Sequence, residues 1–486
     1  MTKSGPSGGR LVRLSDDKEP EKIGFIQCVG TRNKEHNYCS TVCCMHATKE
    51  AILAKENLPE IEIKIFTLDM RAYGKGFEEL YQKAKNVYRI DYVRSRPSFI
   101  EEDPETKDLI VTYVSENGKL VKENFQVIVL SMEFIAPKTT KRDSQIYEIE
   151  LNEHGFIETT DFKPLNTSRD GIFVCGSFSE PKDIPDSITE GSGTSALASA
   201  LLADQKGSLI EKKRYPAQME IDYENPRIGV ILCHCGNEIS KVVKMAELVK
   251  FIRTISDVVV VENEFYACSP QIEKKIEYMI TQYNMNRLVV AACSPRTHAP
   301  LFKEILRDIG INHNMVGVVN LREQCSWVHY SSPYKATQKA MSLIQMAVAK
   351  IKKAKPLLEN YAGINPRALI IGGGIAEMVV ALNLAEQGHP VTLIEKGHDL
   401  GGHLKKIVFT LSGDDPQKLL FNLREKIISN TNIEVLVNSE VTDVKGYVGN
   451  FQSKVVIKKP GEKEDIRKII HGVTIIATMP ILSDSI

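Results

Sequence analysis

Four of the ten cysteines of this 486-residue chain fall in one short segment. They are Cys28, Cys39, Cys43 and Cys44. The apolar residues 22–27 predict a strand before the segment, and the Ala/Lys/Glu/Leu content of residues 45–56 predicts a helix after it. If the helix begins near Ser40, the second and third cysteines lie four residues apart on one face, and the first reaches in from the strand. The pattern therefore predicts a cage of four thiolates.

The spacing of these thiols bears on what they would hold. Thiolates suit zinc, copper(I) and iron–sulfur clusters. Structural zinc sites usually use two Cys-x2–4-Cys pairs, which are not present in this segment. A cubane 4Fe-4S cluster tolerates irregular spacing, because its irons occupy separate corners. A cluster is therefore the favoured interpretation, with zinc and a set of buried free cysteines as alternatives.

Composition points to a cytoplasmic protein of several domains. The 62 basic residues balance 62 acidic residues, which gives no electrostatic basis for binding nucleic acid or a membrane surface. No apolar run is long enough to predict a membrane span, and residues 1–20 read as a disordered lead-in without a signal core. Cysteines in such a protein are expected to be reduced, which favours metal binding over disulfides.

Residues 367–396 predict a strand, a glycine-rich turn, a helix and a second strand. In a Rossmann-type unit, Gly372 makes the tight turn, Gly374 lets the backbone approach a pyrophosphate, and Glu395 accepts hydrogen bonds from ribose hydroxyls. The third glycine of that motif is replaced by Glu377, which crowds the helix–strand packing and brings an anion close to the pyrophosphate. The predicted fold class is α/β, with several parallel-sheet domains including a Rossmann-type dinucleotide-binding βαβ unit.

The middle of the chain repeats a strand-then-helix pattern, which predicts a mostly parallel sheet. Strands are expected at residues 228–232, 258–265, 288–292 and 315–319. Five cysteines lie at or beyond the strand ends, where ligands gather in such sheets. They are Cys233, Cys235, Cys268, Cys293 and Cys325. A cubane uses four, and spacing favours all but Cys235, which stays a close alternative.

An Ala/Ser/Gly-rich helix is expected after Pro185. A strand at residues 172–175 and a Gly/Ser-rich turn are expected to precede it. Small residues allow such a helix to approach a ligand closely, and its N-terminus offers free N–H groups to an anion.

Several of these stretches resemble the A-type flavin and iron–sulfur subunit of heterodisulfide reductase, a protein of methanogens with relatives in other anaerobes. The resemblance lies in GFIQCVGTRNKEHNYCSTVCCMHATKEA, LDMRAYGKGFEELY, CHCG, ACSPR and REQCSWVH. It implies a second cubane in the middle domain, and FAD rather than NAD at the Rossmann unit. Met479 stands where the family usually has glycine. The cofactor-binding residues so implied are Gly372, Gly374, Ile375, Ala376, Glu395, Lys396, Gly401, Gly402, Gly176 and Asp183.

The order of these stretches matches the back half of one such flavin and iron–sulfur subunit followed by the front half of another. The expected parts are a cluster-bearing back half (21–205), a linker (206–225), an α/β cluster domain (226–356) and a Rossmann half-domain (357–486). The chain could be a fragment of a tandem protein, could complete its flavin sites with another chain, or could close on itself as a permuted flavin domain. The first account is preferred on sequence alone.

The resemblance implies an electron-transfer subunit that passes electrons between 4Fe-4S clusters and FAD, with flavin-based bifurcation as one option. Its partners would be other subunits of a heterodisulfide-reductase-like complex, ferredoxin, or hydrogenase or formate dehydrogenase modules. No nucleophile–base set and no P-loop is present, so the sequence predicts no catalytic residue. The alternative is a cluster-bearing scaffold subunit with an empty flavin site.

Overall fold

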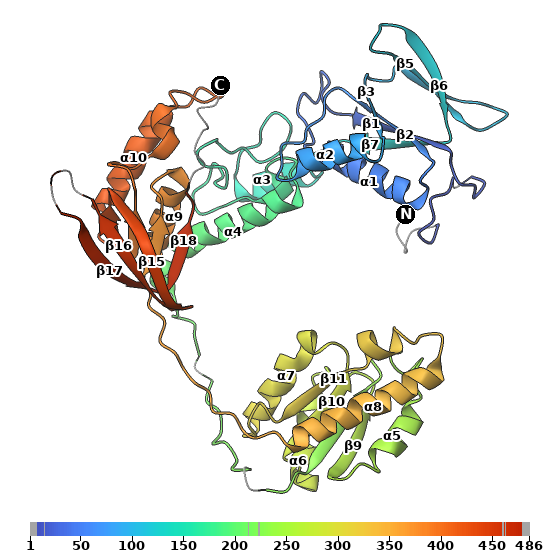
Figure 1. Ribbon diagram of the computed structural model, residues 1–486, viewed down its shortest axis with the longest axis vertical. Coiled ribbons are helices and arrows are strands. Elements are labelled where there is room, and N and C mark those ends of the chain that lie inside the picture. Colours follow the sequence, from blue (N-terminus) through green and yellow to red (C-terminus); the bar gives the residue numbers. More distant parts are fainter. Residues whose placement is uncertain are drawn as a thin grey trace. The chain divides into compact units, whose positions relative to one another are not determined.

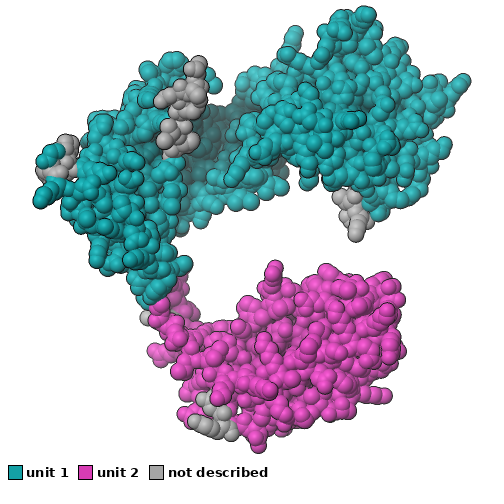
Figure 2. All heavy atoms as spheres, in the orientation of Figure 1, with its two compact units in different colours: residues 1–206, 363–486 teal, residues 207–362 magenta. Residues whose placement is uncertain are grey.

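The protein forms two compact units. The computed structural model describes residues 7–13, 15–211, 213–221, 224–458, 461 and 463–478; Met479 lies outside them, as do parts of the expected lead-in and linker. One unit joins residues 1–206 to 363–486, and residues 207–362 make the other (Figures 1 and 2). We call them unit 1 and unit 2.

Unit 1 begins with a four-stranded parallel sheet. Its order is β3 (Asp91–Arg94), β2 (Glu62–Thr67), β1 (Lys22–Val29) and β7 (Val127–Met132). Three alanines and Ile52 of α1 (Cys43–Asn57) pack on this sheet beside α2 (Phe77–Asn86). A small antiparallel sheet follows, made of β4 (Phe99–Glu102), β5 (Leu109–Val114) and β6 (Leu120–Phe125).

The expected start of the first helix near Ser40 is wrong. Helix α1 begins at Cys43, so Cys39 lies in the preceding loop rather than on the helix. Thr41 has a φ of 58°, a left-handed conformation that a helix cannot continue through. The backbone N–H of Thr41 donates to Cys39 Sγ at 3.3 Å, so the loop before α1 folds around the Cys39 thiol.

Beyond α3 (Thr140–Tyr147), irregular chain leads to α4 (Ile184–Leu201), which carries short 3-10 turns before and after it (Gly176–Phe178 and Ala203–Gln205). The strand expected at residues 172–175 is wrong. Phe173 forms only an isolated bridge with Asn166, because the backbone there bonds to its own loop, with Val174 N–H donating to Leu165 O at 3.0 Å. The expected helix is confirmed, and the Asp183 carboxylate caps it by accepting from Asp186 N–H at 2.8 Å.

The C-terminal part of unit 1 holds the expected Rossmann unit. The parallel sheet has the order β14 (Ile433–Leu436), β13 (Val391–Ile394), β12 (Ala368–Ile371) and β18 (Val473–Ile476). Helices α9 (Ile375–Glu386) and α10 (Pro416–Ser429) pack on it, and an antiparallel sheet is attached, made of β15 (Ser439–Tyr447), β16 (Asn450–Ile457) and β17 (Asp465–His471). Helix α9 also contacts α4, and Gln387 Nε2 donates to Ala196 O at 3.5 Å.

Unit 2 is a three-layer α/β/α domain with the parallel sheet order β11 (Val316–Asn320), β10 (Arg287–Ala292), β8 (Ile228–Cys233) and β9 (Val258–Glu264). One core lies under α5 (Met245–Ile252) and α8 (Pro333–Lys352), and the other under α6 (Ile272–Tyr283) and α7 (Pro295–Asp308). The predicted fold class, α/β with parallel sheets and a Rossmann-type unit, is confirmed. No helix in the described part of the chain has the length and apolarity to span a membrane.

Candidate functional site

The turn between β12 and α9 forms one wall of a cavity of about 570 Å³. Gly372 adopts a φ of 114°, which favours glycine, and its N–H donates to Ile394 O at 2.8 Å. The Glu395 carboxylate lies over the turn: a Cβ on Gly373 would come within 2.6 Å of its Oε2. The loop that contains Gly401 and Gly402 joins the same turn, because Gly401 N–H donates to Gly373 O at 2.7 Å.

Glu377 in the first turn of α9 points back to this glycine turn. Its side chain is 1% exposed and lines the cavity. A Cβ on Gly372 would collide with Glu377 Oε1. Burial raises the pKa of Glu377 and the Glu395 charge adds to the rise, while the N–H groups of Glu377 and Gly374 oppose it. The expectation that Glu377 sets an anion close to the turn agrees with this geometry.

The predicted cofactor-binding residues divide between two places in unit 1. Those that line the cavity are Gly372, Gly374, Glu395, Lys396 and Gly402. Ile375 and Ala376 open α9 next to them. Asp183 instead lines a second cavity, and Gly176 N–H donates to Glu190 Oε2 at 2.8 Å. In the first cavity, the Glu395 carboxylate could accept hydrogen bonds from a ribose, whereas the Glu377 carboxylate lies at the turn that a diphosphate would approach.

Cys28, Cys39, Cys43 and Cys44 gather between the end of β1 and the start of α1. Burial raises the pKa of Cys43 to about 11, and the neighbouring thiols, Cys44 first, add to the rise. Two arginines approach: Arg32 Nη1 lies 4.0 Å from Cys28 Sγ, and Arg96 donates to Cys28 O at 3.0 Å. Thiols that oppose one another's ionisation, with cations beside them, suit a positively charged inorganic core.

A second cavity of unit 1, of about 510 Å³, adjoins these thiols. Its wall combines residues that flank the cysteines with the segment LDMRAYGKGFEELY and the start of α4. From that segment come Arg71, Tyr73, Phe77 and Leu80. In the sequence, only the family resemblance drew attention to this segment. In the structure, its residues line the same cavity as residues that flank the cysteines.

In unit 2, four cysteines line one cavity of about 170 Å³ at the C-terminal edge of the sheet. They are Cys233, Cys235, Cys268 and Cys293. Cys233 Sγ accepts from Cys235 N–H at 3.2 Å and from Ala267 N–H at 3.3 Å, bonds that favour a thiolate. Arg322 Nη1 donates to Cys235 Sγ at 3.3 Å.

Cys325 lies apart from that group. It is 0% exposed, sits in a π-helical turn (Arg322–Ser326), and donates from Sγ to Ala336 O at 3.1 Å. Burial raises the pKa of the Cys325 thiol. The geometry thus groups Cys235, rather than Cys325, with the other three thiols.

Sequence reasoning missed several cavity-lining residues. In the Rossmann cavity they are His403, Ser439, Glu440 and Val441. In unit 2, Tyr266 lies among the cysteines, and a Cβ on Gly236 would come within 2.9 Å of its hydroxyl. The position of Tyr266, two residues before Cys268, was the sequence signal that could have identified it.

Among the described residues, no three His, Cys, Asp or Glu side chains are arranged to hold a metal ion.

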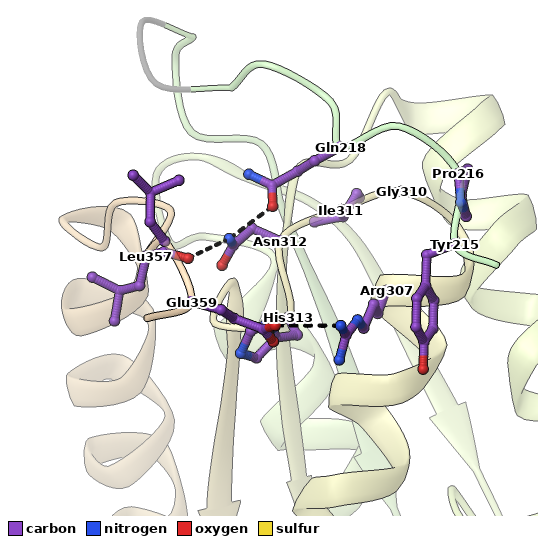
Figure 3. A pocket seen from close by; sticks show the side chains of 11 residues that line it. Tyr215, Pro216, Gln218, Arg307, Gly310, Ile311, Asn312, His313, Leu357 and Glu359 are labelled. Atoms are coloured by element: carbon purple, nitrogen blue, oxygen red, sulfur yellow. Dashed lines mark hydrogen bonds and ion pairs between the residues drawn. The ribbon is translucent and has the colours of Figure 1, made fainter. Parts of the chain in front are cut away.

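A further cavity of unit 2, of about 220 Å³, lies where the chain enters and leaves this unit (Figure 3). Asn312 Nδ2 donates to Gln218 Oε1 and to Leu357 O, both at 3.0 Å, and Glu359 pairs with Arg307 at 3.3 Å. The polar side chains therefore bond mainly to one another, and the hydrogen bonds of Asn312 link the two chain segments that form the cavity wall.

One family model matches a short part of the chain. Residues 370–427 match the model of an NAD(P)-binding Rossmann-like domain, which covers the glycine turn, α9 and β13. Among solved structures, thioredoxin reductase of T. acidophilum covers 36% of this chain and 51% of its own, with 15% identity and a TM-score of 0.27.

Curated sequences give a more particular likeness. The chain is 41% identical over 233 residues to a protein of Archaeoglobus profundus named as similar to the A-type subunit of heterodisulfide reductase, covering 48% of this chain and 33% of that protein. It is 40% identical over 238 residues to an A-type iron-sulfur subunit of the CoB--CoM heterodisulfide reductase of Methanopyrus kandleri. It is 38% identical over 240 residues to the A-type subunit of the H(2):CoB-CoM heterodisulfide,ferredoxin reductase of Methanothermobacter thermautotrophicus. These two matches each cover 49% of this chain and 36% of the relative. The predicted resemblance to the A-type subunit is confirmed, and the chain spans about a third of the length of these relatives.

Proposed function

We propose that this chain is an electron-transfer oxidoreductase subunit of a heterodisulfide-reductase-like complex, with two 4Fe-4S clusters and FAD. The observation that carries the proposal is the gathering of four cysteines in each unit, with arginine beside each group. The names of the similar proteins, which include an iron-sulfur subunit and a ferredoxin reductase subunit, support it.

The proposed ligands are Cys28, Cys39, Cys43 and Cys44 in unit 1, and Cys233, Cys235, Cys268 and Cys293 in unit 2. When bound, clusters supply one-electron transfer, and a flavin exchanges electron pairs for single electrons. The N–H donors to Cys233 and the guanidinium of Arg322 would stabilise negative charge on the thiolates of unit 2. Arg32, held by Asp69, would act in the same way at Cys28.

We further propose that the two sequence-separated parts of unit 1 share the flavin site as a permuted domain. Support comes from their membership of one compact unit and from the contact between α4 and α9. Glu395 would orient the ribose, and the Gly372–Gly374 turn would admit the backbone side of the dinucleotide. Ferredoxin, hydrogenase or formate dehydrogenase modules as partners, flavin-based bifurcation and a cytoplasmic location all stay predictions.

A cluster-bearing scaffold subunit is the second candidate. The observation that favours it is Glu377, whose carboxylate lies where a diphosphate would approach. Under this alternative the clusters would connect partner subunits, and the Rossmann cavity would stay empty.

Metal and flavin content after anaerobic purification separates the candidates. About eight irons, eight sulfides and one flavin per chain support the electron-transfer role. About eight irons without flavin favour the scaffold, and zinc without sulfide contradicts both.

Two serine variants test the ligand set of unit 2. Cys235→Ser should lower the iron content by about half, because one cluster loses a ligand. Cys325→Ser is the matched control and should retain the iron, since its thiol bonds to Ala336 instead. Iron loss in the control alone would contradict the proposed set.

A further inference from the structure

Glu377 is a buried acid without a full set of partners. It is 1% exposed, and its Oε2 has no hydrogen-bond partner. Among the described residues, no cation forms an ion pair with it. A buried, unpaired carboxylate is costly when ionised, so an acid in this position needs an explanation beyond packing.

The position of this acid is the anion-binding end of α9. The first N–H groups of a helix have no partner within the helix, and the macrodipole favours negative charge there. In Rossmann units the diphosphate uses these groups. Here the N–H groups of Gly374 and Glu377 act on the Glu377 carboxylate, whose Cδ would be 3.0 Å from a Cβ on Gly372. The chain thus places its own anion in the position of the ligand's anion.

We propose that FAD binds to this cavity together with one proton. The proton neutralises Glu377, so that the diphosphate can bind at the N-terminus of α9 beside it. The inference rests on the proposed flavin site and adds proton coupling to it. The proton comes from solvent and is bound by the carboxylate; no bond of the ligand changes. A neutral acid at this position no longer repels the diphosphate, and its hydroxyl can donate to a phosphate oxygen.

The charges around Glu377 favour proton uptake. Glu395 at the end of β13 is the charged neighbour that raises the pKa of Glu377, after burial itself. Lys396 in the cavity wall pairs with Glu440 of β15 at 3.4 Å, and His403 also lines the wall. Three charges on the other elements around α9 are paired elsewhere: Arg424 of α10 with Asp399, Glu434 of β14 with Arg467, and Glu190 of α4 with Lys182.

The test is FAD binding by the flavin-free chain of residues 1–486, followed by the quenching of FAD fluorescence between about pH 6 and about pH 9. Wild-type affinity should fall up to about tenfold per pH unit over the range in which Glu377 ionises in the free protein. Glu377→Gln should bind with an affinity that does not change in that range, and Glu377→Gly should bind more tightly than wild type at the alkaline end. Glu386→Gln removes a charge from the exposed far end of the same helix and should behave as wild type.

Calorimetry of the wild-type chain in two buffers of different ionisation enthalpy counts the protons directly. About one proton taken up per FAD supports the inference. If wild type and Glu377→Gln share one pH-independent affinity and take up no proton, the inference is wrong while the flavin site stands. If no variant binds FAD at any pH, the proposed flavin site fails and the inference fails with it.

Discussion

Arg322 should set the reduction potential of the proposed cluster in unit 2. Its Nη1 donates to Cys235 Sγ at 3.3 Å, and its charge opposes the burial that raises the pKa of Cys293. A reduced cluster is more negative than an oxidised one, so a nearby cation favours reduction. Replacing Arg322 with glutamine should therefore make the potential more negative.

The size of the shift follows from Coulomb's law. At a charge separation of about 5 Å and an effective dielectric constant of about 20, the interaction is about 3 kcal/mol. For a one-electron couple this corresponds to roughly 140 mV. The Arg322 side chain is 25% exposed, so water screens part of its interaction with the cluster. We therefore expect a shift in the reduction potential of roughly 50–100 mV.

The assay is a redox titration of the unit 2 cluster followed by electron paramagnetic resonance, with iron content measured first. Arg322→Lys should shift the potential less than Arg322→Gln. Glu323→Gln removes the carboxylate that pairs with Arg322 at 2.7 Å and should shift it in the opposite direction. Equal potentials in wild type and Arg322→Gln, with the cluster fully assembled, would refute the electrostatic argument.

Two further outcomes follow from the pKa shifts. In metal-free protein at about pH 8, Cys43 should react with iodoacetamide roughly a hundredfold more slowly than an ordinary thiol, because burial and the neighbouring thiols raise its pKa to about 11. Site-resolved mass spectrometry can measure the rate, with the exposed Cys175 as the internal reference. Equal rates at the two cysteines would contradict the prediction. Burial opposes ionisation of Glu123, but Lys22, Lys64 and Tyr113 outweigh it and lower its pKa from 4.5 to about 2. Glu123→Gln should thus lower the free energy of unfolding of unit 1 by about 3 kcal/mol at neutral pH, since one pKa unit corresponds to about 1.4 kcal/mol. This contribution is present above about pH 4.5 and is lost as the pH falls toward 2, so a loss that stays constant over this range in urea titrations would argue against it.

Sequence patterns located the elements of unit 2 well. Its four strands lie within a residue or so of the expected ranges, because buried parallel strands are short apolar runs with turn residues at their ends. The glycine turn of the Rossmann unit was also predictable, since Gly372 adopts the positive φ that the motif requires.

The errors lie where the conformation of one residue or a distant contact decides the structure. Composition cannot reveal the left-handed Thr41, which moves the start of α1 to Cys43. The position of Cys325 depends on a π-helical turn that directs its thiol to Ala336, and spacing along the chain carries no trace of that turn. The sequence identified Glu377 as an anomaly, but only the fold places its carboxylate over Gly372.

The side-chain amide of Asn312 affects the entropy cost of inserting unit 2 into the chain. It holds the segment that enters this unit, at Gln218, next to the segment that leaves it, at Leu357. For the remainder of the chain, the insertion of residues 207–362 then acts as a short loop. Because loop-closure entropy grows with the logarithm of loop length, a roughly tenfold shorter effective loop saves about 2 kcal/mol. An insert fastened at its own base can be exchanged as a cassette while the sheets that flank it in sequence keep their fold.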